Sequence, residues 1–273
     1  MPDSDSDAFV VALWRYPVKS MLGEELNSTL IDSQGIVGDR CYAIVDPDTG
    51  KVASAKNPSK WPHLFDCRAA FVRQPCSRED LPPVMVTLPD GSITQSDNGD
   101  FDRLISAMLG RRGKLQSAVP EKPLLEEYWP DIEGLALRDE VTDEALPEGT
   151  FFDLATVHLL TTATLGRLTE LYPRGRFEVR RFRPNIVIEP TAGANGFVEN
   201  LWLDHTLAIG EQVRLRITSG CPRCVMTTLP QSDLPRDPGI LRAAAQHNDA
   251  NVGVYAEVVR GGSIRRGDAV RVL

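Results

Sequence analysis

The sequence predicts a mainly β protein with some helices, of the α+β class, in which most strands run antiparallel. Short runs rich in Val, Ile, Leu and Thr recur along the chain and are separated by Gly, Pro, Asn and Asp. Segments with helical periodicity are scarce, and strands do not alternate with helices as they do in a doubly wound sheet. We therefore expect an antiparallel β-barrel together with a smaller, β-rich N-terminal domain.

The segments with strand length and composition are residues 9–17, 41–55, 84–95, 185–190, 207–220, 252–259 and 268–273. The sequences PDTGK and PDG inside two of them are typical of hairpin turns.

Helical periodicity occurs at residues 99–111, 155–172 and 237–248. The apolar positions of the second segment form one stripe: Leu159, Leu160, Ala163, Leu165, Leu168 and Leu171. We expect His158 to pack on this stripe. Because four prolines interrupt the acidic stretch 113–150, we place a boundary there, between an N-terminal β-barrel-like domain at 1–115 and a second domain at 116–273.

The composition favours an ordinary globular chain. Of 273 residues, 42% are hydrophobic, and 30 Lys and Arg against 38 Asp and Glu give a net charge of −8, which argues against a general nucleic-acid partner. No segment approaches the roughly 18 to 20 apolar residues of a membrane helix, and the acidic start does not resemble a secretory signal. An odd count of five cysteines suggests a reducing compartment. We expect a cytoplasmic protein without a membrane partner.

The sequence Gly220-Cys221-Pro222-Arg223-Cys224 allows three interpretations. A zinc site needs two further ligands, and no second C-x-x-C or H-x-x-x-H motif supplies them. A redox dithiol normally opens a helix, which the β-branched, Pro-broken sequence that follows makes unfavourable. The third interpretation is two neighbouring loop cysteines. We expect the adjacent Arg223 to stabilise a thiolate at Cys224, which would suit soft-metal ligation or sulfur transfer.

A basic cluster precedes the predicted strand at 185–190. In an extended chain Arg181, Arg183 and Asn185 share a face, and Pro184 favours an extended Arg183. These side chains suit phosphate binding. The alternative is a solvated basic edge strand.

Two further motifs lie near the start of the chain. Lys19 and Ser20 follow the first predicted strand, without the preceding glycines of a phosphate-binding P-loop. Gly38-Asp39-Arg40 is consistent with a turn that contains an internal salt bridge.

The order of these motifs resembles the MOSC superfamily, named for the C-terminal domain of molybdenum cofactor sulfurase. The motifs are YPVKS at 16–20, GDR at 38–40, FRPNIVI at 182–188, CPRCVMTT at 221–228 and VGVYAEVVRGGSIRRGD at 252–268. The resemblance covers nearly the whole chain, with a β-barrel-type N-terminal domain followed by a MOSC domain.

The resemblance implies that Cys224 is the catalytic residue and the molybdenum ligand. The residues it implies around the molybdopterin are Lys19, Ser20, Arg40, Thr161, Thr162, Arg183, Asn185 and Tyr255, to which we add Arg223. Molybdopterin carries a phosphate and an anionic dithiolene, so one soft thiolate among several cationic groups fits such a ligand.

Three functions follow as hypotheses. The first is a molybdenum-cofactor oxidoreductase that reduces N-hydroxylated or N-/S-oxide small molecules, with electrons from a separate electron-transfer protein. The second is a sulfur carrier that forms a persulfide on Cys224, with a desulfurase as donor and Cys221 as resolving thiol, and needs no cofactor. The third is a cofactor carrier without turnover. We expect no pyridoxal phosphate in any of them.

Overall fold

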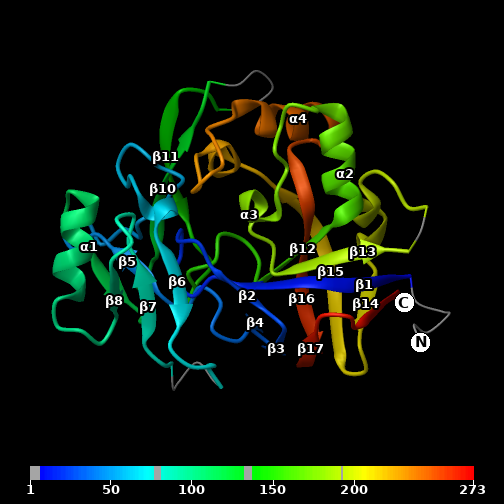
Figure 1. The fold of residues 1–273 in the computed structure, drawn as a ribbon, viewed down its shortest axis with the longest axis horizontal. Coiled ribbons are helices and arrows are strands. Elements are labelled where there is room, and N and C mark those ends of the chain that lie inside the picture. The colour runs from blue at the N-terminus through cyan, green and yellow to red at the C-terminus, as the bar shows by residue number, and fades with distance from the viewer. Residues whose placement is uncertain (1–6, 77–80, 132–136, 192) are drawn as a thin grey trace.

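The computed structural model describes residues 7–76, 81–131, 137–191 and 193–273, and within these ranges the fold is mainly β with four α-helices. Seven strands close into a barrel, which forms the right-hand half of Figure 1. They are β1 (Ala8–Arg15), β12 (Val157–Thr161), β13 (Ile186–Pro190), β14 (Thr206–Ile209), β15 (Val213–Pro222), β16 (Asn251–Arg260) and β18 (Ala269–Val272). The predicted fold class is confirmed.

The order around the barrel is β13-β12-β16-β15-β14-β18-β1, and pairing of β1 with β13 closes the ring. β12 and β13 run parallel, whereas the other barrel pairs are antiparallel. The barrel is therefore mainly antiparallel, as expected, with one parallel pair. Parallel neighbours need a crossover connection, and the helix after β12 provides it.

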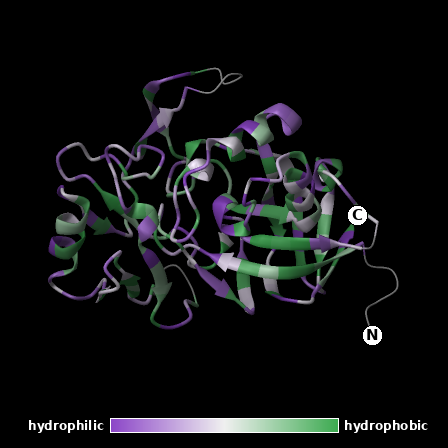
Figure 2. Ribbon diagram, turned by 45° about the horizontal axis from the view of Figure 1, so that its top comes forward, coloured by the Kyte–Doolittle hydropathy of each residue, from purple (hydrophilic) through white to green (hydrophobic). Residues whose placement is uncertain are grey.

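The interior of the barrel is apolar, and Figure 2 shows the hydrophobic residues running along its strands. Leu13, Leu159, Ile217 and Val254 are among the side chains that are completely buried there. Burying one such side chain stabilises a protein by about 1.5–3 kcal/mol. The barrel is thus a firm support for the loops at its ends.

Of the remaining strands, β2 (Glu24–Leu26) extends the barrel sheet, and the others form small sheets, most of them on the left of Figure 1. β2 pairs with β1, and β3 (Ser28–Asp32) pairs with β4 (Gly35–Ile36) and β17 (Gly262–Arg265). The other pairings are β5 (Ala43–Val45) with β9 (Lys114–Gln116), β6 (Arg68–Phe71) with β7 (Val84–Thr87) and β8 (Ile93–Gln95), and β10 (Leu124–Trp129) with β11 (Glu140–Ala145).

A second apolar core holds this N-terminal half together. It includes Trp61, Phe65 and Ile105, and also Val225 and Met226 from the segment that follows Cys224. The N-terminal segment in turn contributes to the barrel, because β1 is one of the barrel strands. The boundary at 115/116 stays a prediction, and strands from both sides of it share one barrel.

The α-helices are α1 (Phe101–Leu109), α2 (Thr162–Leu171), α3 (Val179–Phe182) and α4 (Pro238–Asn248), and the 3₁₀ helices are η1 (Leu64–Asp66), η2 (Val198–Trp202) and η3 (Val225–Thr228). The helices predicted at 99–111 and 237–248 are confirmed as α1 and α4. The helix predicted at 155–172 is wrong in its first part, since residues 157–161 form β12. Within the described part of the chain, no helix is long and apolar enough to cross a membrane.

Candidate functional site

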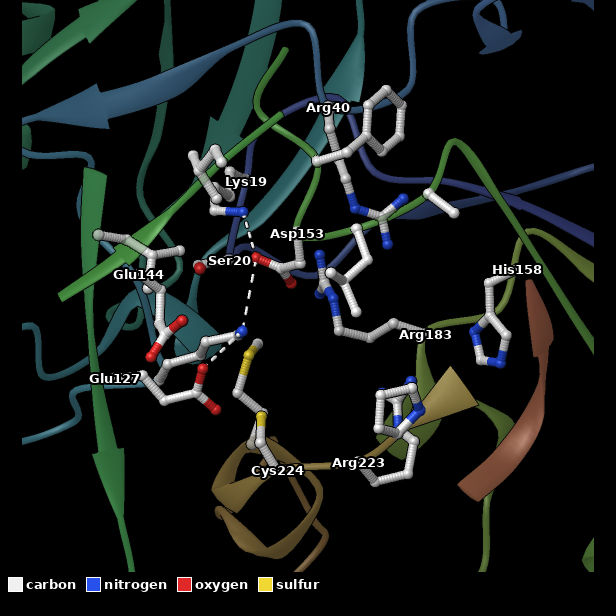
Figure 3. Close-up of a pocket in the computed structure, with 18 of the residues that line it drawn as sticks. Lys19, Ser20, Arg40, Glu127, Glu144, Asp153, His158, Arg183, Arg223 and Cys224 are labelled. Carbon is white, nitrogen blue, oxygen red and sulfur yellow. Dashed lines mark hydrogen bonds and ion pairs between the residues drawn. The ribbon is translucent and has the colours of Figure 1, made fainter. Parts of the chain in front are cut away.

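A cavity of about 280 Å³ lies where the barrel meets the N-terminal half, and Figure 3 shows side chains from both converging on it. The predicted site residues that line it are Lys19, Ser20, Arg40, Arg183, Asn185, Arg223, Cys224 and Tyr255. Residues more than 200 positions apart in the sequence therefore meet at one place.

Thr161 and Thr162 do not line this cavity. Thr161 is fully buried, and its hydroxyl accepts a hydrogen bond from the Thr164 backbone N–H (3.1 Å) and donates one to Glu199 (2.5 Å). This threonine caps the N-terminus of α2, of which Thr162 is the first residue. Both residues are thus placed in the start of a helix and not among the lining residues.

Asp39 organises the turn that carries Arg40. Its carboxylate forms an ion pair with Arg40, as the sequence predicted, and accepts hydrogen bonds from the Tyr16 backbone (2.7 Å) and the Asn185 side chain (2.9 Å). The Arg40 guanidinium lies 4.9 Å from the centre of the Tyr16 ring. Asn185 and Arg40 are therefore fixed by the same buried carboxylate.

The extended arrangement predicted for Arg181, Arg183 and Asn185 is wrong. Arg181 lies in α3 and is fully buried, where it donates to the backbone carbonyls of Thr227 (3.1 Å) and Leu229 (3.2 Å). Arg183 adopts a left-handed backbone conformation, with φ of 53°. The three side chains do not share one face of a strand, and they do not belong to a solvated edge strand. The guanidinium groups instead donate hydrogen bonds to buried carbonyl groups, which need partners.

Arg183 is held from two sides. Its guanidinium donates to the Met21 carbonyl (2.6 Å) and lies 4.2 Å from the centre of the Tyr16 ring. Burial, reinforced by Arg40, lowers its pKa to about 10. The group is still charged at neutral pH.

Three residues that line the cavity have positive φ: Ser20 (64°), Arg40 (46°) and Arg183 (53°). The left-handed region costs a non-glycine residue about 1–2 kcal/mol. Such strain concentrates at functional sites, where the surrounding structure enforces it.

A network of ion pairs was missed by the sequence analysis. Lys19 donates to Asp153 (2.6 Å) and to the Phe151 carbonyl (2.7 Å), and Lys56 pairs with Glu127 (2.9 Å) and lies 3.8 Å from Asp153. Figure 3 shows this chain along one side of the cavity. Burial lowers the pKa of Lys19 to about 8, although Asp153 opposes the shift. Burial alone would raise the pKa of Asp153, but the two lysines outweigh it and lower that pKa.

The expected pairing of Arg223 with Cys224 is wrong. The guanidinium of Arg223 donates to the sulfur of Cys221 (2.6 Å) and to the Phe182 carbonyl (3.0 Å). Burial would raise the pKa of the Cys221 thiol, but Arg223, followed by His158 and Tyr255, outweighs burial and lowers it. At Cys224 burial prevails over Lys56 and raises the pKa to about 11. Cys224 is therefore a protonated thiol at neutral pH, half-buried at the cavity wall.

The segment after Cys224 forms the single 3₁₀ turn η3, although the sequence disfavoured a helix. This single turn forms despite its β-branched residues, because Val225 and Met226 pack in the N-terminal core.

His158 also lines the cavity, from β12 and not from a helix. Its Nε2 lies 3.0 Å from the Val252 carbonyl oxygen, and its ring packs edge-on against Tyr255, with ring centres 5.8 Å apart. Gly253 leaves the space for this ring, since a Cβ there would lie 2.4 Å from Nε2. His158 is packed, as expected, but in a strand.

The donor set of the cavity distinguishes between kinds of ligand. Among the described residues no three His, Cys, Asp or Glu side chains gather as a metal site, which does not fit the zinc interpretation. The cavity instead offers one thiol together with Lys19, Lys56, Arg40, Arg183 and Arg223. The buried Nε of Arg223 has no partner within the described structure. This set fits an anionic ligand that brings its own soft metal.

Comparisons with known families agree with the motifs. A family model described as the MOSC domain matches residues 148–271, and one described as the MOSC N-terminal beta barrel domain matches residues 7–109. The chain belongs to the MOSC superfamily. The predicted resemblance is confirmed.

Two curated MOSC relatives are enzymes of different kinds. The chain is 32% identical over 139 residues to mitochondrial amidoxime reducing component 2 of Rattus norvegicus, which covers 45% of this chain and 38% of that protein. It is 24% identical over 283 residues to molybdenum cofactor sulfurase of Bos taurus, covering 93% of this chain and 31% of that protein. The chain thus spans less than two-fifths of either relative.

Solved structures resemble the chain more distantly. The YuaD protein of Bacillus subtilis covers 97% of this chain and is itself covered to 94%, with a TM-score of 0.49 and 13% identity. YiiM of Escherichia coli covers 44% of this chain and is covered to 54%, with a TM-score of 0.33 and 12% identity.

Proposed function

We propose that this chain binds a molybdenum cofactor in the cavity and reduces N-hydroxylated or N-/S-oxide small molecules. One observation carries the proposal: a half-buried thiol, Cys224, faces a cavity to which both halves of the molecule contribute cationic side chains. Cys224 would be the metal ligand, and the pterin and its phosphate would occupy the cationic side. When bound, the cofactor supplies the exchange of electrons with the substrate.

The protein's own part begins at Cys224. Because its pKa is about 11, the free protein keeps this thiol protonated, and Cys224 would have to release that proton to hold a soft metal. Packing of Val225 and Met226 in the N-terminal core fixes the position of the sulfur. The ligand is therefore available without being a reactive thiolate beforehand.

The cationic groups are arranged before any ligand arrives. Asp39 holds Arg40, the Met21 carbonyl holds Arg183, and Asp153 holds Lys19. Preorganised charge binds an anion without a large cost of ordering side chains. The Ser20 hydroxyl accepts a hydrogen bond from the Ala55 backbone N–H (3.0 Å), which holds the turn that carries Lys19 and Ser20 in place.

Reduction of an N–O bond consumes two electrons and two protons and releases water. The electrons would come from a separate electron-transfer protein. We also propose a reducing, cytoplasmic location, because all five cysteines are free thiols.

The decisive test compares two cysteine variants made in a host that synthesises the cofactor. Cys224→Ala should lose molybdenum and activity, since a methyl group cannot ligate the metal. Cys221→Ala should retain molybdenum and lose much less activity. The measurement is molybdenum per protein by elemental analysis, with reduction of an amidoxime as the activity. Full molybdenum occupancy in Cys224→Ala would refute the proposal.

The match to molybdenum cofactor sulfurase supports a second candidate, a sulfur carrier. Here the Cys224 thiolate would attack the persulfide of a donor desulfurase, which releases the donor's thiolate and leaves a persulfide on Cys224. The raised pKa of Cys224 disfavours this reaction at neutral pH. Intact mass spectrometry decides it, since the carrier should gain the mass of one sulfur atom in wild type and not in Cys224→Ala.

A further inference from the structure

The cavity has a second wall of different chemistry, made by the β10–β11 hairpin. In the register of this pair, Leu125 lies opposite Glu144 and Glu127 opposite Thr142. Opposed residues of an antiparallel pair share a face, as do residues two apart along a strand. Leu125, Glu127, Trp129 and Glu144 all line the cavity, so this face of the hairpin is turned toward it.

The two carboxylates of this wall differ in whether a cationic side chain pairs with them. Glu127 is buried and neutralised by Lys56 at 2.9 Å. Glu144 is half-buried, and within the described residues its carboxylate receives a hydrogen bond from the Thr142 hydroxyl (2.7 Å) but forms no ion pair. Figure 3 shows the Glu144 side chain on the side of the cavity opposite Arg40 and Arg183. A negative charge at the cavity wall is left without a counter-charge.

The position of Glu144 is fixed through its neighbours. The indole N–H of Trp129 donates to the Thr142 hydroxyl oxygen (2.8 Å), and that hydroxyl donates to Glu144 Oε1. The chain of hydrogen bonds orients one carboxylate oxygen and leaves the other, Oε2, for a ligand.

Apolar side chains also belong to this wall of the cavity. Leu146 and the Trp129 ring line the same wall, and Leu154 lines the cavity although it is 63% exposed. An exposed leucine beside an aromatic ring and a fixed carboxylate is suited to a ligand with a flat apolar body and a positive end.

We propose that Glu144 is a specificity-determining residue that accepts hydrogen bonds from the nitrogen end of a planar, N-hydroxylated amidine or guanidine and pairs with the amidinium or guanidinium that its reduction leaves, while Trp129 and Leu154 cover the body of the ligand. The inference rests on the proposed function in one respect: it makes the β10–β11 wall the substrate side of a cavity whose cationic side holds the cofactor.

Equilibrium binding of two probes tests the inference without turnover. Benzamidine is a planar cation, and benzamide has nearly the same shape without the charge. Protein isolated from a cofactor-producing host should bind benzamidine more tightly in calorimetric titrations. In Glu144→Gln the benzamidine affinity should fall by about tenfold or more, as for the loss of a hydrogen bond between charged groups, and benzamide affinity should not change.

Asp143→Asn is the matched control. It removes the same charge one residue away, on the opposite face of β11, where Asp143 pairs with Lys51. It should leave both affinities unchanged. Trp129→Phe keeps an aromatic ring but removes the donor to Thr142, and should lower benzamidine affinity less than Glu144→Gln does. Circular dichroism of each variant establishes that it is folded.

The inference is overturned if wild type shows no preference for benzamidine, or if Glu144→Gln binds it as tightly as Asp143→Asn does. Molybdenum is measured in the same samples, which separates the two proposals. A preference for benzamidine without molybdenum would sink the proposed function alone. Molybdenum retention without any preference would sink the inference alone.

Discussion

Lys19 is a buried charged residue that lines the cavity. Its ammonium group is almost completely buried, between the Phe151 carbonyl and the Asp153 carboxylate. Burial opposes the charged form more than Asp153 supports it, so the pKa falls to about 8. The group is charged below that pH and becomes neutral as the pH rises through it.

We therefore expect anion binding in the cavity to weaken above pH 8. Inorganic pyrophosphate titrated into cofactor-free protein should bind less tightly at pH 9 than at pH 7. Lys19→Met should bind it weakly at both values and lose the difference between them. A pH dependence in Lys19→Met equal to that of wild type would assign the effect to another group.

Site residues with a local motif could be predicted from the sequence, and those without one could not. Arg40 follows Asp39 directly, and Cys224 belongs to a C-x-x-C segment. Lys56 and Asp153 carry no such signal, because each acquires its role from partners about 70 residues away or more. Arg223 pairs with Cys221 because the end of β15 places that thiol beside the guanidinium group. Adjacency in the sequence had suggested Cys224 instead.

At the scale of elements, the start of α2 shows how a helix boundary is set. Leu159 and Leu160 fit a helical stripe, but both are buried in β12, between β13 and β16. The helix begins where Thr161 caps it. The periodicity of the segment carries no sign of the two neighbouring strands that make 157–161 extended.

The Glu199 carboxyl group beneath this helix predicts a pH-dependent stability. It is fully buried, accepts hydrogen bonds from Thr161 (2.5 Å) and Thr164 (2.7 Å), and has a pKa raised by burial. For an acid with a raised pKa, this contribution to stability is complete below about pH 4.5 and is lost as the pH rises through the folded-state pKa.

Glu199→Gln removes that titration. Urea unfolding at pH 5 and pH 8 should show the variant gaining stability relative to wild type as the pH rises. The control is Glu189→Gln, which changes an exposed carboxylate on β13. If both variants follow the wild-type pH profile, Glu199 does not titrate as its burial indicates.

At the scale of the whole molecule, closure of the barrel depends on the first strand. β1 pairs with β13 on one side and β18 on the other, so strands separated by more than 170 residues become neighbours. The strand character of 9–17 could be predicted from its composition, but its partners could not, because β-pairing over such distances leaves no local pattern.

Deletion of residues 1–15 should open the barrel. The edges of β13 and β18 would then expose unpaired backbone groups, which favour aggregation. Size-exclusion chromatography should show aggregated protein in place of the wild-type species. A cooperatively folded, monodisperse variant without β1 would show that the ring closes in another way.

The position of β1 also limits how this sequence can be recombined. An exchange of segments between related proteins with a crossover at 115/116 would give a barrel six of whose strands come from one parent and one from the other. The register between Leu13 and Ile186, and between Phe9 and Ala269, would have to match across the two parents. Chimeras should therefore survive more often when residues 7–15 are inherited together with the strands that flank them.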